Sequence, residues 1–192
     1  MRYFRPAVSL MVFMTLALGI AYPLALTGLS RMLFPVQASG SLLHKGTALV
    51  GSRLIGQHFS DPGHFWGRPS ATAPQPDNGL SSGGSNLGPL NPALLDQVDA
   101  NINALKAAAA PQEHGNVPVD LVTASGSGLD PEISVAAAQY QGARIARARN
   151  LAPADVQALI ARLQKGPLFG IIGESRVNVL ELNMALDSPM NE

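Results

Sequence analysis

VPVDLVTASGSGLDPEIS, residues 117–134, is an apolar run that passes into small polar residues and ends before a helix start. Its apolar residues predict a buried strand over 117–122, which Pro118 confines to a sheet edge or a strand entry. The small residues at 123–128 let a backbone approach a partner or ligand closely. Asp130, with a proline after it, predicts the N-cap and first turn of a helix. The segment therefore predicts a strand-to-helix junction that either only turns the chain or also presents a surface.

A helix is predicted directly after this junction, over residues 131–150. Its inward side would include Ile133, Ala137, Tyr140 and Ile145. Three arginines cluster toward its end, where cations complement the helix dipole. A solvated helix end is the first interpretation of this cluster, and a contact with an anion or a partner is the second. The three arginines are Arg144, Arg147 and Arg149.

The remaining segments predict an α/β domain around this centre. A helix capped at Asn91 runs to the alanine run before Pro111, and Gly/Pro-rich residues at 59–92 form an unusually long loop that is functional, mobile or both. The other predicted elements are one or two short hairpins at 41–55, a polar linker at 112–116, a helix at 153–164, a strand at 177–180 and a helical turn at 181–186.

The amino terminus predicts a single transmembrane helix. No charged residue occurs from Pro6 to Ser30, and this length is enough to cross a bilayer core of about 30 Å. A cleaved secretory signal is the alternative, but the apolar run is too long and lacks a clean cleavage triplet. We therefore expect a membrane anchor at residues 1–35, spanning about 7–30, followed by one compact α/β extracytoplasmic domain at 36–192.

The membrane helix carries a stripe of small residues that recur at helical spacing. Such a stripe allows helix backbones to pack closely in lipid, so it predicts docking against other membrane helices. The common use of alanine in such helices is the alternative explanation. The stripe consists of Ala17, Ala21, Ala25 and Gly28.

Charge and composition exclude several functions. All 13 acidic residues follow the anchor, whereas three of the 13 basic residues precede or end it, so the domain has ten basic residues against 13 acidic ones. This slightly acidic balance argues against a nucleic-acid partner. Because cysteine is absent, disulfide scaffolds, zinc-thiolate sites and thiol nucleophiles are excluded.

No catalytic constellation stands out in the sequence. The four histidines are scattered without metal-ligand spacing, and no GxSxG nucleophile elbow occurs. Asp96 and Asp99 share a helix face that a solvated surface explains. A membrane-tethered periplasmic hydrolase that uses Ser125 or Ser127 with a distant histidine remains the alternative enzyme hypothesis. The histidines are His44, His58, His64 and His114.

Five motifs in fixed order, behind an apolar span that begins RPAVS, closely resemble the KdpC family, the C chain of the bacterial high-affinity potassium-transporting ATPase. The resemblance covers essentially the whole chain. The motifs are GRPSATA at 67–73, SGGSNLGPLNP at 82–92, the opening segment at 117–134, RIARARNL at 144–151 and VNVLELNMALD at 177–187. The sequence departs from the family pattern at His64, where tyrosine is usual, and at Glu132, a variable turn position.

The resemblance implies a non-catalytic accessory subunit in a membrane complex with the Kdp A, B and F chains. ATP hydrolysis then belongs to the B chain, and ATP and K+ are handled by the complex, so no cofactor is expected on this chain. The family's C chain is described as a catalytic chaperone that raises the ATP affinity of the B chain. That role makes Ser82, Gly83, Gly84 and Ser85 weak nucleotide candidates, because the Gly-rich run is likened to the LSGGQ signature of ABC transporters. The run here reads LSSGGS, and it lacks a phosphate-binding lysine.

The expected location is the bacterial inner membrane, with the amino terminus in the cytoplasm and the domain in the periplasm. A periplasmic domain cannot touch cytoplasmic ATP, so any effect on ATP affinity would pass through membrane helices as a coupling free energy. Besides the lipid bilayer, the expected partners are the other Kdp chains. The predicted partner contacts are Ala17, Ala21, Ala25, Gly28, Arg68, Asn86, Ser125 and Ser127.

Overall fold

A computed structural model describes residues 2–109 and 115–188. The chain divides into two compact units, residues 1–42 and 43–192. His114 and most of the predicted linker at 112–116 lie outside the described residues.

The first unit contains one continuous apolar helix. Residues Phe4–Leu33 form 30 helical residues with a mean hydropathy of 2.0, which is long and apolar enough to cross a membrane. Within it, α1 (Phe4–Leu16) and α2 (Tyr22–Leu33) flank a π-helical turn, η1 (Ala17–Ala21), and α3 (Pro35–Ala38) follows.

The π-helical turn has a local cause in the proline that follows it. Pro23 has no N–H to donate, and its ring crowds the carbonyl four residues earlier. The helix widens just before it, and the Tyr22 N–H is donated to the Ala17 carbonyl instead. Because the widened turn contains two members of the small-residue stripe, it changes how these residues line up along the helix.

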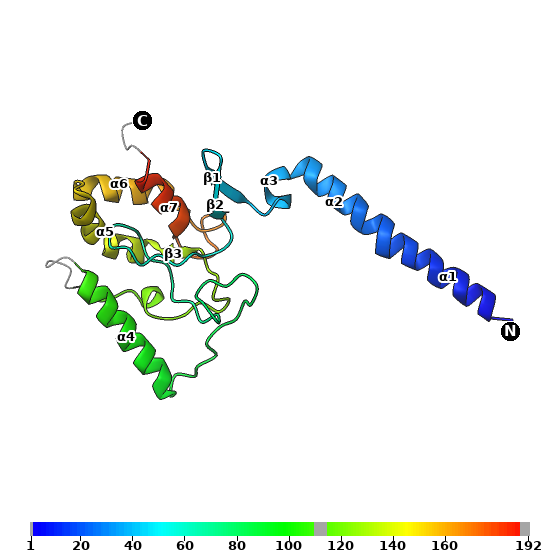
Figure 1. Ribbon diagram of the computed structural model, residues 1–192, viewed down its shortest axis with the longest axis horizontal. Coiled ribbons are helices and arrows are strands. Elements are labelled where there is room, and N and C mark those ends of the chain that lie inside the picture. The colour runs from blue at the N-terminus through cyan, green and yellow to red at the C-terminus, as the bar shows by residue number, and fades with distance from the viewer. Residues whose placement is uncertain (1, 110–114, 189–192) are drawn as a thin grey trace. The chain divides into compact units, whose positions relative to one another are not determined.

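The second unit is a mixed α/β fold in which short strands and helices follow one another (Figure 1). Two sheets of two strands each are present in the described residues, β1–β2 and β3–β4. The elements are β1 (Leu42–Lys45), β2 (Ala48–Ser52), α4 (Pro92–Ala108), η2 (Val119–Leu121), β3 (Glu132–Ser134), α5 (Val135–Arg149), α6 (Pro153–Leu163), β4 (Arg176–Asn178) and α7 (Val179–Leu186).

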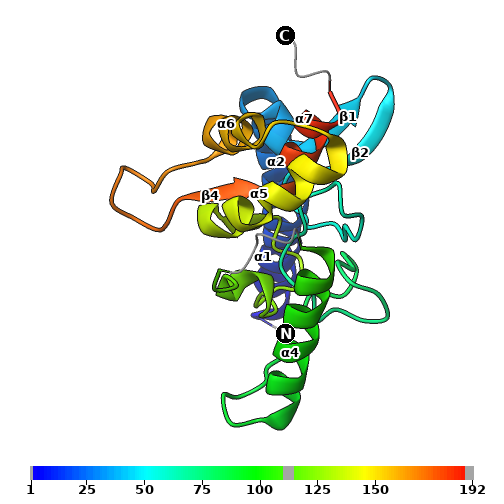
Figure 2. The same cartoon turned by 90° about the vertical axis from the view of Figure 1, so that its left-hand side faces the viewer.

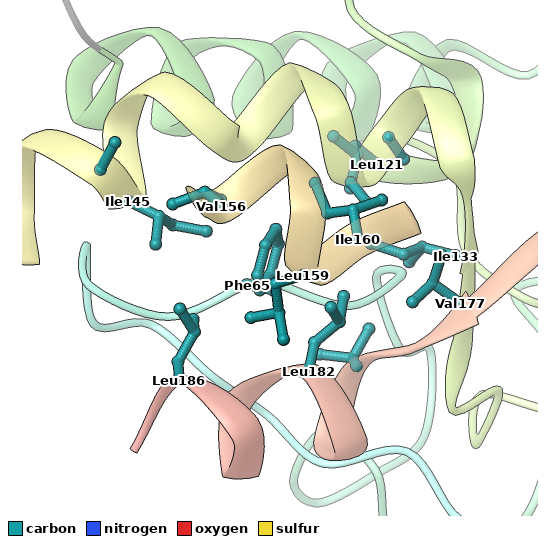
Figure 3. Packing of buried hydrophobic residues seen from close by; sticks show 14 of the residues in the cluster. Phe65, Leu121, Ile133, Ile145, Val156, Leu159, Ile160, Val177, Leu182 and Leu186 are labelled. Atoms are coloured by element: carbon teal, nitrogen blue, oxygen red, sulfur yellow. The ribbon is translucent and has the colours of Figure 1, made fainter. Parts of the chain in front are cut away.

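One apolar core holds α5, α6, α7 and the β3–β4 pair together (Figure 3). The pair is antiparallel, and Ile133 lies opposite Val177 with both side chains buried. Phe65 enters the same core from the long loop and is completely buried. The start of that loop is therefore part of the folded core, although the loop has no regular secondary structure.

Several predicted elements are confirmed. The helix α4 begins after Asn91, whose side chain accepts a hydrogen bond from the Ala93 amide. The hairpin of β1 and β2 turns at Gly46, which has a left-handed φ of 63°. The helix at 153–164 is α6.

The predicted strand at 117–122 is wrong. Residues 119–121 form a turn of 3₁₀ helix, and the only strand of this region is β3, further along the chain. Asp120 explains the difference, because its carboxylate accepts hydrogen bonds from the Ser134 amide at 2.7 Å and the Ser134 hydroxyl at 3.2 Å. These bonds fold the segment back onto the start of α5 rather than extending it.

The predicted start of the following helix is also wrong. Asp130 makes a local turn by accepting from the Glu132 amide, and the N-cap of α5 is Ser134, which accepts from the Ala137 amide at 3.0 Å. The predicted strand at 177–180 is likewise corrected, because Asn178 caps α7 and ends β4. In both places a strand of three residues leads directly into a helix, and the last residue of the strand is the N-cap of that helix.

Candidate functional site

Three of the sequence motifs meet in one place, which we call the loop junction and define as residues 67–73, 82–86 and 123–130. The Gly83 amide and the Ser82 hydroxyl both donate to the Ser127 carbonyl, each at 2.9 Å. The Ser125 amide donates to the Pro69 carbonyl at 3.2 Å. Segments more than 40 residues apart are thus fastened together through their backbones.

Small residues are required where these segments cross. A Cβ on Gly128 would lie 2.6 Å from the Gly83 carbonyl oxygen, and the φ of Gly128 is +65°, a conformation that favours glycine. A Cβ on Gly84 would lie 2.9 Å from the Gly126 carbonyl oxygen. Packing of the two segments against each other therefore explains Gly84 and Gly128, whereas a Cβ on Gly83 or Gly126 would meet nothing within 4 Å.

Arg68 connects the junction to the start of the β3 segment. One of its terminal nitrogens lies 3.1 Å from the Asp130 carboxylate, and the other donates to the Ala124 carbonyl at 3.4 Å. Its Nε is buried and has no hydrogen-bond partner among the described residues. The partly buried ion pair therefore orients the guanidinium, and one donor remains unused in the isolated chain.

The predicted partner contacts fall into two groups. Ser125 is only 3% exposed, so its side chain is inside the loop junction, whereas Ser127 and Asn86 are exposed at its surface. Arg68 is partly buried. Ala21, Ala25 and Gly28 are exposed on the apolar helix, and Ala17 is partly buried there. The structure thus brings Arg68, Ser125 and Ser127 together in the loop junction and Asn86 to its edge.

The nucleotide and hydrolase interpretations find no support in this geometry. The Gly83 amide is already donated to Ser127, so it is not free to bind a phosphate. The Ser127 hydroxyl accepts from the Leu129 amide at 3.1 Å. Across residues 2–109 and 115–188, no hydrogen bond joins Ser125 or Ser127 to a histidine, and no group of metal-ligating side chains is assembled.

Two amide side chains hold the long loop against the helices. Gln141 on α5 accepts from the Trp66 amide at 2.7 Å and donates to the Trp66 carbonyl at 3.1 Å. Asn183 on α7 does the same for Phe65, at 2.8 and 3.0 Å. Both side chains are buried, so each satisfies a backbone donor and acceptor that water cannot reach. Neither residue could be singled out beforehand, because each occupies an ordinary helical position.

Arg144 is not part of a solvated helix end, and that expectation is wrong for this residue. It is 2% exposed, and its guanidinium lies over the Trp66 ring at 4.6 Å from the ring centroid. It donates to the Pro62 carbonyl, to the His64 carbonyl at 3.0 Å and to Gln141 at 2.7 Å. Arg147 is exposed, as expected, and donates to the Ala109 carbonyl.

Arg149 joins a charged cluster at the ends of α5 and α7. One of its terminal nitrogens lies 2.8 Å from the Asp187 carboxylate and 2.7 Å from the Nε2 atom of His64. Burial raises the pKa of the Asp187 carboxyl, but the hydrogen bond and charge of Arg149, with the charges of Lys45 and His64, outweigh it and hold that pKa below its ordinary value. His64 therefore lies in a polar cluster in which its two ring nitrogens face Asp61 and Arg149.

A cavity of about 260 Å³ adjoins the loop junction. Its walls include Trp66, Arg68 and the α4 residue Leu105. Asp77 also lines it, and burial raises the pKa of this carboxyl against the opposing charge of His58. With this volume and a mostly apolar lining, the cavity can hold a small apolar group or a side chain as well as water.

These features define a class of protein: an apolar amino-terminal helix long enough to span a bilayer, followed by an α/β unit whose motif loops are fastened to one another. The family model described as KdpC, K+-transporting ATPase, c chain, matches residues 4–188. The chain belongs to this family.

Curated relatives agree over nearly the full length. A potassium-transporting ATPase KdpC subunit of Variovorax paradoxus (strain S110) is 61% identical over 184 residues, which cover 96% of this chain and 95% of the relative. The protein of the same description in Polaromonas naphthalenivorans (strain CJ2) is 59% identical over 189 residues, with coverage of 97% and 96%.

Proposed function

We propose that this chain is a membrane-anchored, non-catalytic subunit of a potassium-transporting ATPase, assembled with the A, B and F chains of the complex in the bacterial inner membrane. The observation that carries the proposal is the loop junction. Three of the motifs that identify the family are used there to fasten loops together, and the hydroxyl and amide groups of Ser82, Gly83 and Ser127 are engaged with backbone partners. Such groups build a surface rather than a reaction centre.

The proposed topology places the amino terminus in the cytoplasm and the α/β unit in the periplasm. An influence on ATP binding by the B chain, the proposed chaperone role, then requires that membrane helices transmit a coupling free energy. The apolar helix Phe4–Leu33 supplies the covalent route for this coupling, and its exposed small residues supply close-packing positions.

Thiol labelling tests the topology with little disturbance, because the chain has no cysteine of its own. Ser127→Cys introduces one exposed thiol, and Ser125→Cys introduces one at a buried neighbouring position as a matched control. An impermeant reagent should label Ser127→Cys in intact cells with an opened outer membrane, and label Ser125→Cys far less. Labelling of Ser127→Cys only in inverted vesicles would overturn the proposed orientation.

Co-purification tests the subunit role. A tagged full-length chain expressed with the other Kdp chains should bring them down in mild detergent as one species. Migration of the tagged chain alone would contradict the proposed function.

A further inference from the structure

Among the described residues of the second unit, exposed large apolar side chains are most concentrated in the segment between α6 and β4. Figure 2 shows it in orange, extending away from the helices between α6 and β4. We call residues 167–172 the apolar loop. Its four large side chains are Leu168, Phe169, Ile171 and Ile172, with exposed fractions of 57%, 85%, 84% and 58%. Contiguous apolar side chains on a soluble surface commonly mark an interaction site.

The loop is built as a fixed shape. Lys165 and Arg176 exchange two backbone hydrogen bonds at its base, at 2.8 and 3.0 Å, and Leu168 and Ile172 exchange two more, at 2.8 and 3.0 Å. At the tip Phe169 has a φ of 53°, which is unfavourable for a residue with a bulky side chain. A conformation of this kind persists only where its surroundings impose it, and here it presents the Phe169 ring to solvent.

The charges around the loop decide between a lipid surface and a protein surface. Lys165 is paired with Glu132 at 3.3 Å and Glu181 at 3.4 Å, and Arg176 is paired with Glu132 at 2.6 Å. Membrane-binding loops combine apolar residues with free Lys or Arg for anionic lipids. Two residues after this loop, the exposed Glu174 carboxylate instead forms no ion pair with any described residue.

We propose that the apolar loop docks into an apolar hollow on another subunit of the transport complex, and that a basic residue at the rim of that hollow pairs with Glu174. The inference rests on the proposed function, since it takes its partner from the complex. Phe169 and Ile171 are the central anchors because they are the most exposed of the four. The prearranged turn reduces the ordering that binding requires.

A photocrosslinking experiment in the full complex tests this inference. The photoreactive amino acid p-benzoylphenylalanine replaces Phe169 in the tagged chain, and the same replacement at Leu80, which is 99% exposed in another loop, is the control. Irradiation should join position 169 to one of the other Kdp chains, with little product from position 80. A product with lipid alone, a product with a second copy of this chain, or no product from an intact complex would each overturn the proposal.

Matched variants add a second readout. Ile171→Asp should reduce recovery of the other subunits about tenfold after detergent washing, while Leu80→Asp should leave recovery unchanged. Glu174→Lys should lower the crosslinking yield at position 169. An unchanged or higher yield would refute the proposed pairing of Glu174 with a basic residue of the other subunit. Unfolding midpoints followed through Trp66 verify that these variants fold. If the wild-type chain brings down no other subunit, the proposed function fails; if it does and Ile171→Asp behaves like Leu80→Asp, only the loop inference fails.

Discussion

Replacing the buried Arg144 by methionine should destabilise the second unit strongly, although this residue lies in a helix segment that looks solvated in sequence. The substitution keeps an unbranched side chain and removes the charge and the donors. It removes hydrogen bonds to the carbonyls of Pro62 and His64, and to the Gln141 side chain that holds Trp66. The substitution therefore also weakens the hydrogen bonds by which Gln141 holds the backbone of Trp66 in the long loop.

The expected magnitude follows from these contacts. A hydrogen bond from a charged donor contributes about 1.5–3 kcal/mol, and each buried carbonyl left without a partner costs about 1–3 kcal/mol. Part of this is recovered because a buried guanidinium no longer has to be desolvated. We expect a net loss of about 3–5 kcal/mol in the free energy of unfolding, which is at the upper end for single substitutions.

Urea unfolding of the full-length chain in detergent measures this loss. The chain has a single tryptophan, Trp66, which lies under the guanidinium and reports directly on this region. With a denaturant dependence of about 2 kcal/mol per molar urea, the midpoint should fall by about 2 M. Arg147→Met is the matched control, because Arg147 is exposed on the same helix. A midpoint within about 0.3 M of the control would refute the assigned role of Arg144.

Three further outcomes are expected. Gly128→Ala should lower the melting temperature by about 5–10 °C, because a Cβ there meets a carbonyl oxygen at a left-handed φ, whereas Gly88→Ala, in open space, should change it little; equal shifts in calorimetry would contradict the packing argument. Asp187→Asn should destabilise the chain at neutral pH. The folded pKa of Asp187 is lowered, so its contribution is present above its ordinary pKa and lost as pH falls through the folded value; a deficit in urea midpoint that persists undiminished at about pH 2 would exclude this carboxylate as its source. Ala21→Leu should weaken recovery of the complex and Ile20→Leu should not, since a bulky group at a small-residue position separates packed helices; normal recovery from Ala21→Leu would count against helix docking.

Local signals in the sequence were sufficient for some elements and insufficient for others. The helix α4 and the β1–β2 hairpin follow from signals carried within a few residues, the Asn91 cap and the Gly46 turn. The strand predicted over 117–122 failed because its apolar pattern also suits a short turn packed on the core. Asp120 determines which of the two forms, because its carboxylate accepts a hydrogen bond from the amide of Ser134, 14 residues further along the chain.

The candidate site shows the same limit. The motif segments of the loop junction could be recognised individually, but their contacts join residues such as Ser82 and Ser127, 45 positions apart. The burial of Arg144 could not be predicted, because the carbonyls that accept its hydrogen bonds belong to residues 82 and 80 positions earlier. Arg147 and Arg149 follow it three and five residues later, so helix position and composition alone did not separate the buried Arg144 from the partly buried Arg149 and the exposed Arg147.

Besides its apolar core, the second unit thus has two less common features, buried polar side chains and exposed apolar ones. The buried polar side chains Gln141, Arg144 and Asn183 hold a loop that has no secondary structure of its own. Part of the surface is a hydrogen-bonded turn with four exposed apolar residues. Buried polar groups fix one arrangement of the loop, because any other arrangement leaves them unsatisfied. Exposed apolar groups have the opposite effect, since they are satisfied only by association. A chain that has both buried polar groups and exposed apolar groups is suited to a fixed position in an assembly. Variants separate the two effects, because substitutions at Arg144 should change the stability of the chain, whereas substitutions at Ile171 should change the stability of the complex.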